Sequence, residues 1–236
     1  MNIRKYNILT LGLICFMSYS IAGTLSGHVK YDGKAPRSKK LRMDADPVCG
    51  SSHSGPVYGE SFKMSSDGSM EEALVYLKKV DYSGGVPSSP VVLDQKGCIY
   101  TPHVLGMVAG QELLIKNSDA TLHNIHSMPK VNKEFNFAMP KVVKTKKATF
   151  EKSEPEPFYI KCDVHPWMRS WVLVSDHPYF SVTDKAGNFS IEGIPAGTYE
   201  VMCWQEKFKK KPLTATVTIG SGTTNQDFTF TRPKKK

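Results

Sequence analysis

Three side chains that bind soft metals recur at three-residue intervals in the stretch KCDVHPWMRSW, residues 161–171: Cys162, His165 and Met168. A thiolate, an imidazole and a thioether together suit copper, because soft sulfur ligands and imidazole bind copper in both of its oxidation states. A loop of the form C-x-x-H-x-x-M brings the three groups to one point when the cysteine ends one strand and the methionine begins the next. The spacing therefore predicts a ligand loop for one metal ion.

A copper site of this kind also needs a second imidazole. The stretch SDATLHNIH offers His123, which lies 39 residues before Cys162, a separation that suits a neighbouring strand. The alternative is that these residues belong to the core and that their spacing is accidental, but a fourfold coincidence in a β-rich sequence favours the metal. Zinc could occupy the same cysteine and histidines, although it prefers an oxygen or nitrogen fourth ligand over Met168. We predict one copper site, cycling between Cu²⁺ and Cu⁺, with ligands His123, Cys162, His165 and Met168.

Other candidate ligands have simpler interpretations. His126 lies three residues from His123, hence on the opposite face of a strand, and is interpreted as a surface residue. Met128 and Met139 are interpreted as packing residues, and His103 and Met107 as packing residues of a loop. A second, softer copper(I) site formed by His126, Met128 and Met139 stays open as an alternative.

The elements that must position these ligands are strands. Twelve short stretches rich in β-branched and aromatic residues are separated by Gly, Pro, Asn and Asp, which predicts an all-β fold of one or two sandwiches. The predicted strands are 26–31, 72–80, 89–95, 111–117, 147–151, 157–162, 170–176, 179–184, 187–193, 197–204, 213–220 and 226–231. No long amphipathic helix is predicted.

The motifs HNIH and CDVHPWM together resemble those of cupredoxins, the type 1 blue copper proteins, most closely the amicyanin and plastocyanin branch. The resemblance implies a Greek-key β-sandwich and the four ligands named above. It also implies that Asn124 ties the ligand loops together and protects the sulfur. Trp167 stands where amicyanin has a phenylalanine, and with Pro166 it is expected to surround an exposed edge of His165, as an apolar patch for electron transfer. The alternative is that this patch is internal, packed on an outer domain.

A second resemblance involves the flanks. SGHVKYDGKAP, ALVYL and TDKAGNFSIEGIPAGTYEVMCW are similar to carboxypeptidase regulatory-like domains, which are small transthyretin-like β-sandwiches. This implies a discontinuous outer domain at 23–85 and 178–233, with the cupredoxin domain inserted at 86–177. Exported bacterial proteins of this composite build are often methylamine-utilisation-like.

The first residues are typical of a secretory signal peptide, with a charged start, a short apolar run and cleavage after about Ala22. We therefore expect a periplasmic or secreted protein with no transmembrane segment in the mature chain. Four cysteines remain, which allow two disulfides in three connectivities. If Cys162 binds metal, one bridge and one free thiol are expected. Cys49 and Cys98 lie beside glycines, as bridge partners often do, and Cys203 is expected to be buried and free.

The net charge of +9 arises from lysine patches that favour an acidic partner, and no nucleic-acid signature accompanies them. The patches are Lys141, Lys144, Lys146, Lys147 and Lys152; Lys207, Lys209, Lys210 and Lys211; and a basic tail at 234–236. We predict an electron carrier for an acidic redox protein such as a c-type cytochrome or a dehydrogenase. Copper storage, delivery or resistance is the alternative. The paired HxH and HCH elements of copper oxidases and nitrite reductases are missing from the sequence, so we expect no catalysis by this chain alone.

Overall fold

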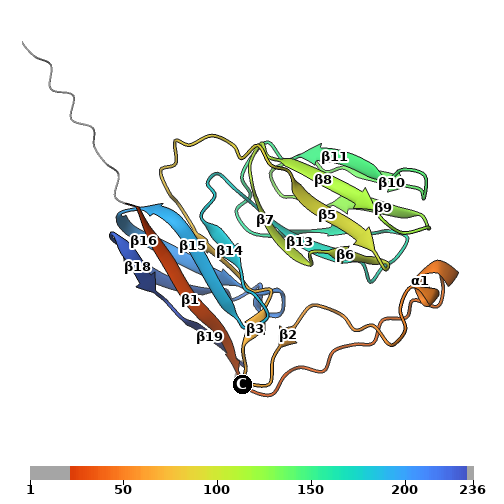
Figure 1. Cartoon of the computed structure of the whole chain (residues 1–236), viewed down its shortest axis with the longest axis horizontal. Coiled ribbons are helices and arrows are strands. Elements are labelled where there is room, and N and C mark those ends of the chain that lie inside the picture. Colours follow the sequence, from red (N-terminus) through yellow and green to blue (C-terminus); the bar gives the residue numbers. More distant parts are fainter. Residues whose placement is uncertain (1–21, 233–236) are drawn as a thin grey trace, which may run out of the picture.

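The computed structural model of the protein describes residues 22–232, and these form an all-β structure, as predicted (Figure 1). The predicted signal peptide, up to residue 21, and the basic tail at 234–236 lie outside the described residues. Within the described range, no helix has the length and apolar character needed to cross a membrane. The strands group into two sandwiches, each made of two main sheets (Figure 1).

The site sandwich, which carries all the predicted copper ligands, consists of a five-stranded and a four-stranded sheet. The five-stranded sheet has the order β10 (Asn136–Met139), β9 (His123–Ser127), β12 (Phe158–Lys161), β13 (Arg169–Ser175) and β7 (Val104–Val108). The four-stranded sheet has the order β11 (Thr145–Thr149), β8 (Glu112–Asn117), β5 (Val91–Lys96) and β6 (Ile99–Thr101). The pairs β13–β7 and β5–β8 are parallel, and the other neighbours are antiparallel.

Alternating burial along the strands forms the core between these two sheets. In β8, Leu113 and Ile115 are fully buried, whereas Glu112, Leu114 and Lys116 are partly exposed. This period of two is what a sheet with one buried face requires. The segment around Met107, which we predicted to be a loop, is strand β7, whose four apolar side chains are buried. The prediction was wrong because the stretch VLGMV has Gly106 at its centre and no aromatic residue, so it lacks the enrichment that identified other strands buried on both faces, such as β13.

The outer sandwich combines strands from both ends of the described chain. One sheet is built around β1 (Ala22–Asp32), which pairs with β15 (Asn188–Pro195), β18 (Gly222–Asn225) and β19 (Phe228–Thr231). The other has the order β14 (Phe180–Val182), β4 (Leu74–Leu77), β16 (Gly197–Trp204) and β17 (Leu213–Ile219). A two-stranded sheet of β2 (Lys63–Met64) and β3 (Met70–Glu71) and a short 3₁₀ helix, η1 (Glu206–Phe208), complete the assignment. The predicted domain boundaries stay a prediction.

The two sandwiches contact each other through a small apolar cluster. Trp171 and Leu173 of β13 meet Trp204 of β16 and Leu74 of β4, and the ring centroids of Trp171 and Trp204 are 5.1 Å apart. The ammonium group of Lys209 lies 4.6 Å from the centroid of the Trp171 ring, which adds a cation–π contact. The outer sandwich therefore packs against strand β13 of the sheet that carries the ligand loop.

A charged cluster lies beside this contact. His103 Nε2 is 2.7 Å from a carboxylate oxygen of Glu206, and its Nδ1 is 3.9 Å from Glu60. Lys63 forms ion pairs with Glu60 and Glu72. Burial would lower the pKa of His103, but the hydrogen bond to Glu206 and the nearby negative charges of Glu72 and Glu60 outweigh it, so the pKa is raised above 6.5.

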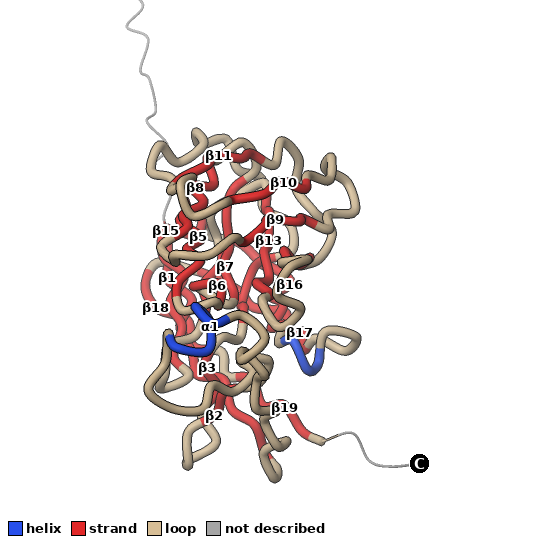
Figure 2. The backbone as a smooth tube through the Cα atoms, turned by 90° about the vertical axis from the view of Figure 1, so that its right-hand side faces the viewer, coloured by secondary structure: helices blue, strands red, loops and turns tan. Residues whose placement is uncertain are grey.

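One irregular segment leaves the outer sandwich after β1 and reaches the far end of the site sandwich, where it forms helix α1 (Pro47–Ser51) (Figures 1 and 2). We call residues 39–57 of this segment the cap. Its two ends are held together by backbone hydrogen bonds from Leu41 N to Val57 O and from Gly59 N to Lys39 O. Met43 and Cys49 of the cap belong to the core of the site sandwich. The cap is thus packed onto the site sandwich.

Candidate metal centre

The ligand loop lies between two neighbouring strands of the five-stranded sheet. Cys162 follows the last residue of β12, and Met168 precedes the first residue of β13. Backbone hydrogen bonds from Cys162 N to Met168 O (3.2 Å) and from Met168 N to His165 O (2.9 Å) close the loop. Cys162, His165 and Met168 are all buried, although they belong to a connection between two strands.

The second imidazole comes from the adjacent strand β9. Lys161, the residue before Cys162, pairs with His126 of this strand, so β9 lies directly beside the ligand loop. His123 is fully buried, and its Nδ1 lies 2.9 Å from Nδ1 of His165, which in turn is 3.8 Å from Sγ of Cys162. The three donor atoms lie within 4.8 Å of one another. Chain segments about 39 residues apart thus bring a thiol and two imidazoles to one point.

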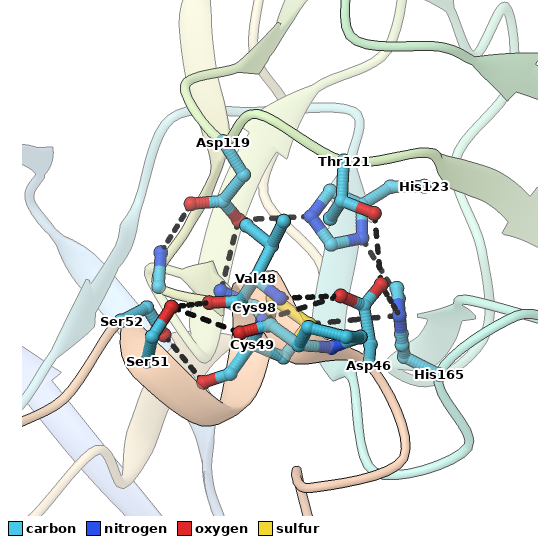
Figure 3. The surroundings of a disulfide bond; sticks show 12 residues. Asp46, Val48, Cys49, Ser51, Ser52, Cys98, Asp119, Thr121, His123 and His165 are labelled. Carbon is cyan, nitrogen blue, oxygen red and sulfur yellow. Dashed lines mark hydrogen bonds and ion pairs between the residues drawn. A yellow bond between two sulfur atoms is a disulfide. The ribbon is translucent and has the colours of Figure 1, made fainter.

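Each imidazole is held at its outer nitrogen by a carboxylate. His123 Nε2 donates to Oδ2 of Asp119 at 2.8 Å, and His165 Nε2 donates to Oδ2 of Asp46 at 3.1 Å (Figure 3). Carboxylates in this position fix the ring orientation and make the opposite nitrogen a better metal ligand. Both Nδ1 atoms therefore point inward because both Nε2 atoms are engaged.

The proton affinities of the three groups follow from their neighbours. Burial alone would lower the pKa of His123, but its hydrogen bonds to Asp119 and Cys162 raise that pKa to about 9. Burial also dominates at His165 and lowers its pKa; the hydrogen bond to Asp46 opposes this, and the charge of His123 adds to it. Burial raises the pKa of the Cys162 thiol, yet the hydrogen bonds from His123 and from backbone N–H groups outweigh it and leave the pKa below its usual value.

The hydrogen-bond geometry and these directions together indicate which ring carries a second proton in the metal-free site. Both Nε2 atoms donate to carboxylates, so the 2.9 Å contact between the two Nδ1 atoms needs a second proton on one of the rings; the raised pKa of His123 and the lowered pKa of His165 favour His123 as the ring that carries it. Metal ligation at Nδ1 requires His123 to release one proton. The two Nδ1 atoms thus already face each other without metal, and a metal ion bound to both would replace the proton between them.

Asn124 joins the two ligand-bearing segments. Its side-chain oxygen accepts a hydrogen bond from the backbone N–H of Asp163, and its side-chain amide donates to Oδ1 of Asn136 at 2.7 Å. Its own backbone N–H is among the groups that lower the pKa of Cys162. The side chain of Asn124 therefore links β9 to the ligand loop, and its role in a copper site stays a prediction.

The predicted disulfide between Cys49 and Cys98 is confirmed, and Cys162 and Cys203 are free and buried. Cys98 lies at the tip of the β5–β6 hairpin, where Gly97 and Cys98 both have positive φ, as a two-residue type I′ turn requires. Asp119 accepts hydrogen bonds from the backbone N–H groups of both tip residues, and also from His123. The disulfide is therefore tied to the site on its hairpin side by Asp119 and on its cap side by Asp46.

The expectation of an exposed edge on His165 was wrong. The residue is 3% exposed, and the cap covers it, with Cys49 Sγ 3.6 Å from its Nε2 (Figure 3). The internal alternative agrees better with the structure: the covering element is the cap, whose residues 39–57 lie in the range 23–85 predicted for the outer domain, although it is not a strand of the outer sandwich. Trp167 does lie beside His165, at 5.1 Å between ring centroids, and donates from Nε1 to the carbonyl oxygen of Cys98. A cavity of about 970 Å³ remains next to His165, Pro166 and Trp167.

The three residues considered for a second copper site have separate partners. His126 lies on the opposite face of β9, as predicted, between the carboxylates of Asp163 (2.8 Å) and Glu134 (2.6 Å). Met139 is fully buried and accepts a hydrogen bond from Gln95, while Met128 lines a cavity near Trp171 and Trp204. The side chains are thus engaged elsewhere and do not form one donor set.

The donor set fits copper. Two inward Nδ1 atoms, each with its outer nitrogen fixed, and a thiol with a lowered pKa provide the two imidazoles and one thiolate that copper accepts in either oxidation state. Met168 is buried in the same core cluster as Cys162. Sequence reasoning missed Asp46 and Asp119. Asp119 could have been found, since it lies four residues before His123, whereas Asp46 is 119 residues from His165 and has no local signal.

Comparisons with solved structures return cupredoxins. A purple cupredoxin from Nitrosopumilus maritimus is 23% identical, and the match covers 36% of this chain and 99% of that chain with a TM-score of 0.30. A methionine-to-alanine mutant of amicyanin in its Cu(I) form is 22% identical, covering 44% of this chain and 100% of that chain, with a TM-score of 0.32. A copper-containing nitrite reductase from Thermus scotoductus SA-01 is 21% identical, covering 43% of this chain and 25% of that chain, with a TM-score of 0.32. The ligand assignment rests on the geometry described above and not on these similarities.

The family model described as polysaccharide lyase family 4, domain II, matches residues 145–227. This range begins with β11 of the site sandwich and ends after β18 of the outer sandwich. No curated protein matches the sequence. Nothing in these comparisons supports the predicted resemblance to methylamine-utilisation proteins, and the resemblance to carboxypeptidase regulatory-like domains stays a prediction.

Proposed function

We propose that the protein is an exported type 1 copper protein that transfers single electrons to or from a redox partner. The observation that carries the proposal is the convergence of His123 Nδ1, His165 Nδ1 and Cys162 Sγ within 4.8 Å, with both outer imidazole nitrogens bound to carboxylates. When bound, copper supplies a centre that alternates between Cu²⁺ and Cu⁺. Met168 is proposed as the weak fourth ligand.

The chain's own residues hold the donors still. Asp119 and Asp46 fix the two imidazole rings, and Asn124 fixes the loop that carries Cys162. All three donor side chains are buried, Cys162 in the core of the site sandwich and His165 beneath the cap, which limits their movement. A site whose ligands are already in place needs little rearrangement when its charge changes, and this favours fast electron exchange over catalysis by the chain alone.

The partner is proposed to be an acidic redox protein such as a c-type cytochrome or a dehydrogenase. Lys39 and Arg42 line the cavity beside His165 and Trp167, and thus lie where such a partner would approach. Complementary charge accelerates encounter between proteins more than it raises affinity. The disulfide between Cys49 and Cys98 is the kind that persists in oxidising compartments, which supports export to the periplasm or beyond.

Copper storage or delivery is the second candidate, and one observation favours it. His165 is 3% exposed beneath the cap, so almost none of its ring is open to contact by a partner. A protein that holds copper as cargo benefits from such a cover. The two candidates differ in measurable terms, because a carrier exchanges electrons reversibly, whereas a storage protein passes Cu⁺ itself to an acceptor.

The optical spectrum of copper-loaded protein tests the proposal. We expect an intense visible thiolate-to-copper band that Cys162→Ser abolishes. Cys203→Ser is the matched control, because Cys203 is the other buried free thiol and lies in the core of the outer sandwich. A reversible electrode potential would support the carrier, and ready transfer of Cu⁺ to a chelator without reversible redox would support storage. A colourless wild-type protein would refute a type 1 site.

A further inference from the structure

We propose that Asp46 is a positioning residue that completes the metal centre, and that the cap exists to hold its carboxylate against His165. This inference rests on the proposed function for its effect on copper, but its structural part concerns the metal-free protein. The carboxylate of Asp46 binds both the helix of the cap and His165 of the ligand loop (Figure 3).

The two oxygens of Asp46 have different tasks. Oδ1 caps helix α1 by accepting from the backbone N–H groups of Val48 (2.8 Å) and Cys49 (3.3 Å). Oδ2 accepts from the hydroxyl of Thr121 (2.8 Å) and from Nε2 of His165 (3.1 Å). The orientation of the His165 ring is therefore coupled to the start of a helix more than a hundred residues away in sequence.

Three independent links keep the cap in this place. The Cys49–Cys98 disulfide joins α1 to the β5–β6 hairpin, and His53 Nε2 lies 2.7 Å from the carbonyl oxygen of Gly97 in the same hairpin. Met43 packs into the core of the site sandwich. Because the hairpin tip is also bound by Asp119, the outer nitrogens of both imidazoles are held by one connected unit.

The chemistry predicts what loss of the carboxylate does. With an acceptor at Oδ2, His165 keeps its ring proton on Nε2 and presents the lone pair of Nδ1 toward His123. With a donor in the place of Oδ2, the proton moves to Nδ1 or the ring turns, and the lone pair no longer faces the site. Partners of this kind change metal affinity by about 10–100-fold.

Asp46→Asn is the sharpest variant, because it is nearly isosteric, can keep its oxygen on the helix cap, and turns an amide donor toward His165 and Thr121. Asp44→Asn is the matched control, since Asp44 is an exposed acid on the same cap. The first readout is ¹⁵N NMR of the imidazoles in the metal-free, full-length mature protein. We expect the proton of His165 on Nε2 in the wild type and in Asp44→Asn, and a shift toward Nδ1 in Asp46→Asn.

The second readout is Cu⁺ affinity by competition with a chelator. We expect Asp46→Asn to weaken binding by about 10–100-fold and Asp44→Asn to change it less than about twofold. The Cys49→Ser/Cys98→Ser variant, which adds no thiols, should weaken binding to a similar degree, and adding Asp46→Asn to it should cause little further loss, because both changes release the same contact. Far-UV circular dichroism checks that each variant is folded.

The outcomes separate this inference from the proposed function. If Asp46→Asn leaves both the His165 tautomer and the Cu⁺ affinity unchanged in a protein that binds copper, the inference is overturned and the proposed function stands. If the wild type binds no copper but Asp46→Asn still shifts the tautomer, the proposed function fails and the positioning role of Asp46 stands. If Asp44→Asn produces the same changes as Asp46→Asn, the effect is one of net charge and the inference is overturned.

Discussion

The Cys49–Cys98 disulfide should contribute a large part of the stability of the site sandwich. It closes a loop with a sequence separation of 49 residues, for which the chain-entropy relation gives roughly 14 cal/mol/K, or about 4 kcal/mol at 25 °C. Both sulfur atoms are buried in the core, so serine at these positions adds no compensating contact. We expect Cys49→Ser/Cys98→Ser to lower the free energy of unfolding by about 4 kcal/mol.

Urea unfolding followed by tryptophan fluorescence measures this loss, because Trp167 donates a hydrogen bond to Cys98 and reports on the same region. For an m-value near 2 kcal/mol/M, the midpoint should fall by roughly 2 M. The wild type treated with a thiol-free reductant should lose a similar amount, and the double variant should not respond to the reductant. A loss below about 1 kcal/mol would mean that the reduced chain keeps the loop closed by other contacts, and the reasoning from loop entropy would be refuted.

Substitutions of His103, Asn124 and Trp171 test three other contacts of the structure. In urea unfolding of the metal-free protein, the free energy of unfolding of the wild type should exceed that of His103→Gln most strongly below about pH 6.5. This difference should shrink as pH rises through the raised pKa of His103, by at most about 1.4 kcal/mol per pH unit. A difference that grows with pH would contradict the predicted sign. Asn124→Ala leaves the backbone N–H of Asp163 without its acceptor and should lower the free energy of unfolding by about 1–3 kcal/mol. The visible absorption band of the copper-loaded protein should also change, and an unaltered band would show that Asn124 does not hold the loop. Trp171→Ala should lower the free energy of unfolding by about 3–5 kcal/mol, because it leaves a cavity in the contact between the sandwiches. Val142→Ala is the control, since this side chain is 77% exposed, and it should lower the free energy of unfolding by less than about 0.5 kcal/mol. Equal losses in the two variants would refute the packing argument.

The part of the site that sequence predicts is the part with a local pattern. Cys162, His165 and Met168 could be grouped because one hairpin loop supplies all three, and their spacing matches the connection between β12 and β13. His123 could be added because a second histidine on a neighbouring strand is within reach of such a loop. Richness in β-branched and aromatic residues was enough to predict most strands, including β13, which is buried on both faces, but it did not identify β7 or β10.

The part that sequence does not predict depends on where an irregular segment folds back. Nothing between residues 39 and 57 alternates or repeats, so its path over the site sandwich is set by tertiary contacts of Met43 and Cys49. The position of Asp46 against His165, and hence the closure of the imidazole edge, follows from that path. Cys49 and Cys98 could be paired because glycine neighbours mark turns, but their nearness to the metal centre could not be foreseen.

In the proposed centre, one copper ion is held by two imidazoles and a thiolate from distant parts of the chain. A crystal structure of the copper-loaded protein with anomalous data at the copper edge tests it most directly. We expect a single strong anomalous peak within bonding distance of Nδ1 of His123, Nδ1 of His165 and Sγ of Cys162, with Asp46 and Asp119 still on the outer nitrogens. Copper bound through Nε2 of either histidine, or at another place on the chain, would contradict it.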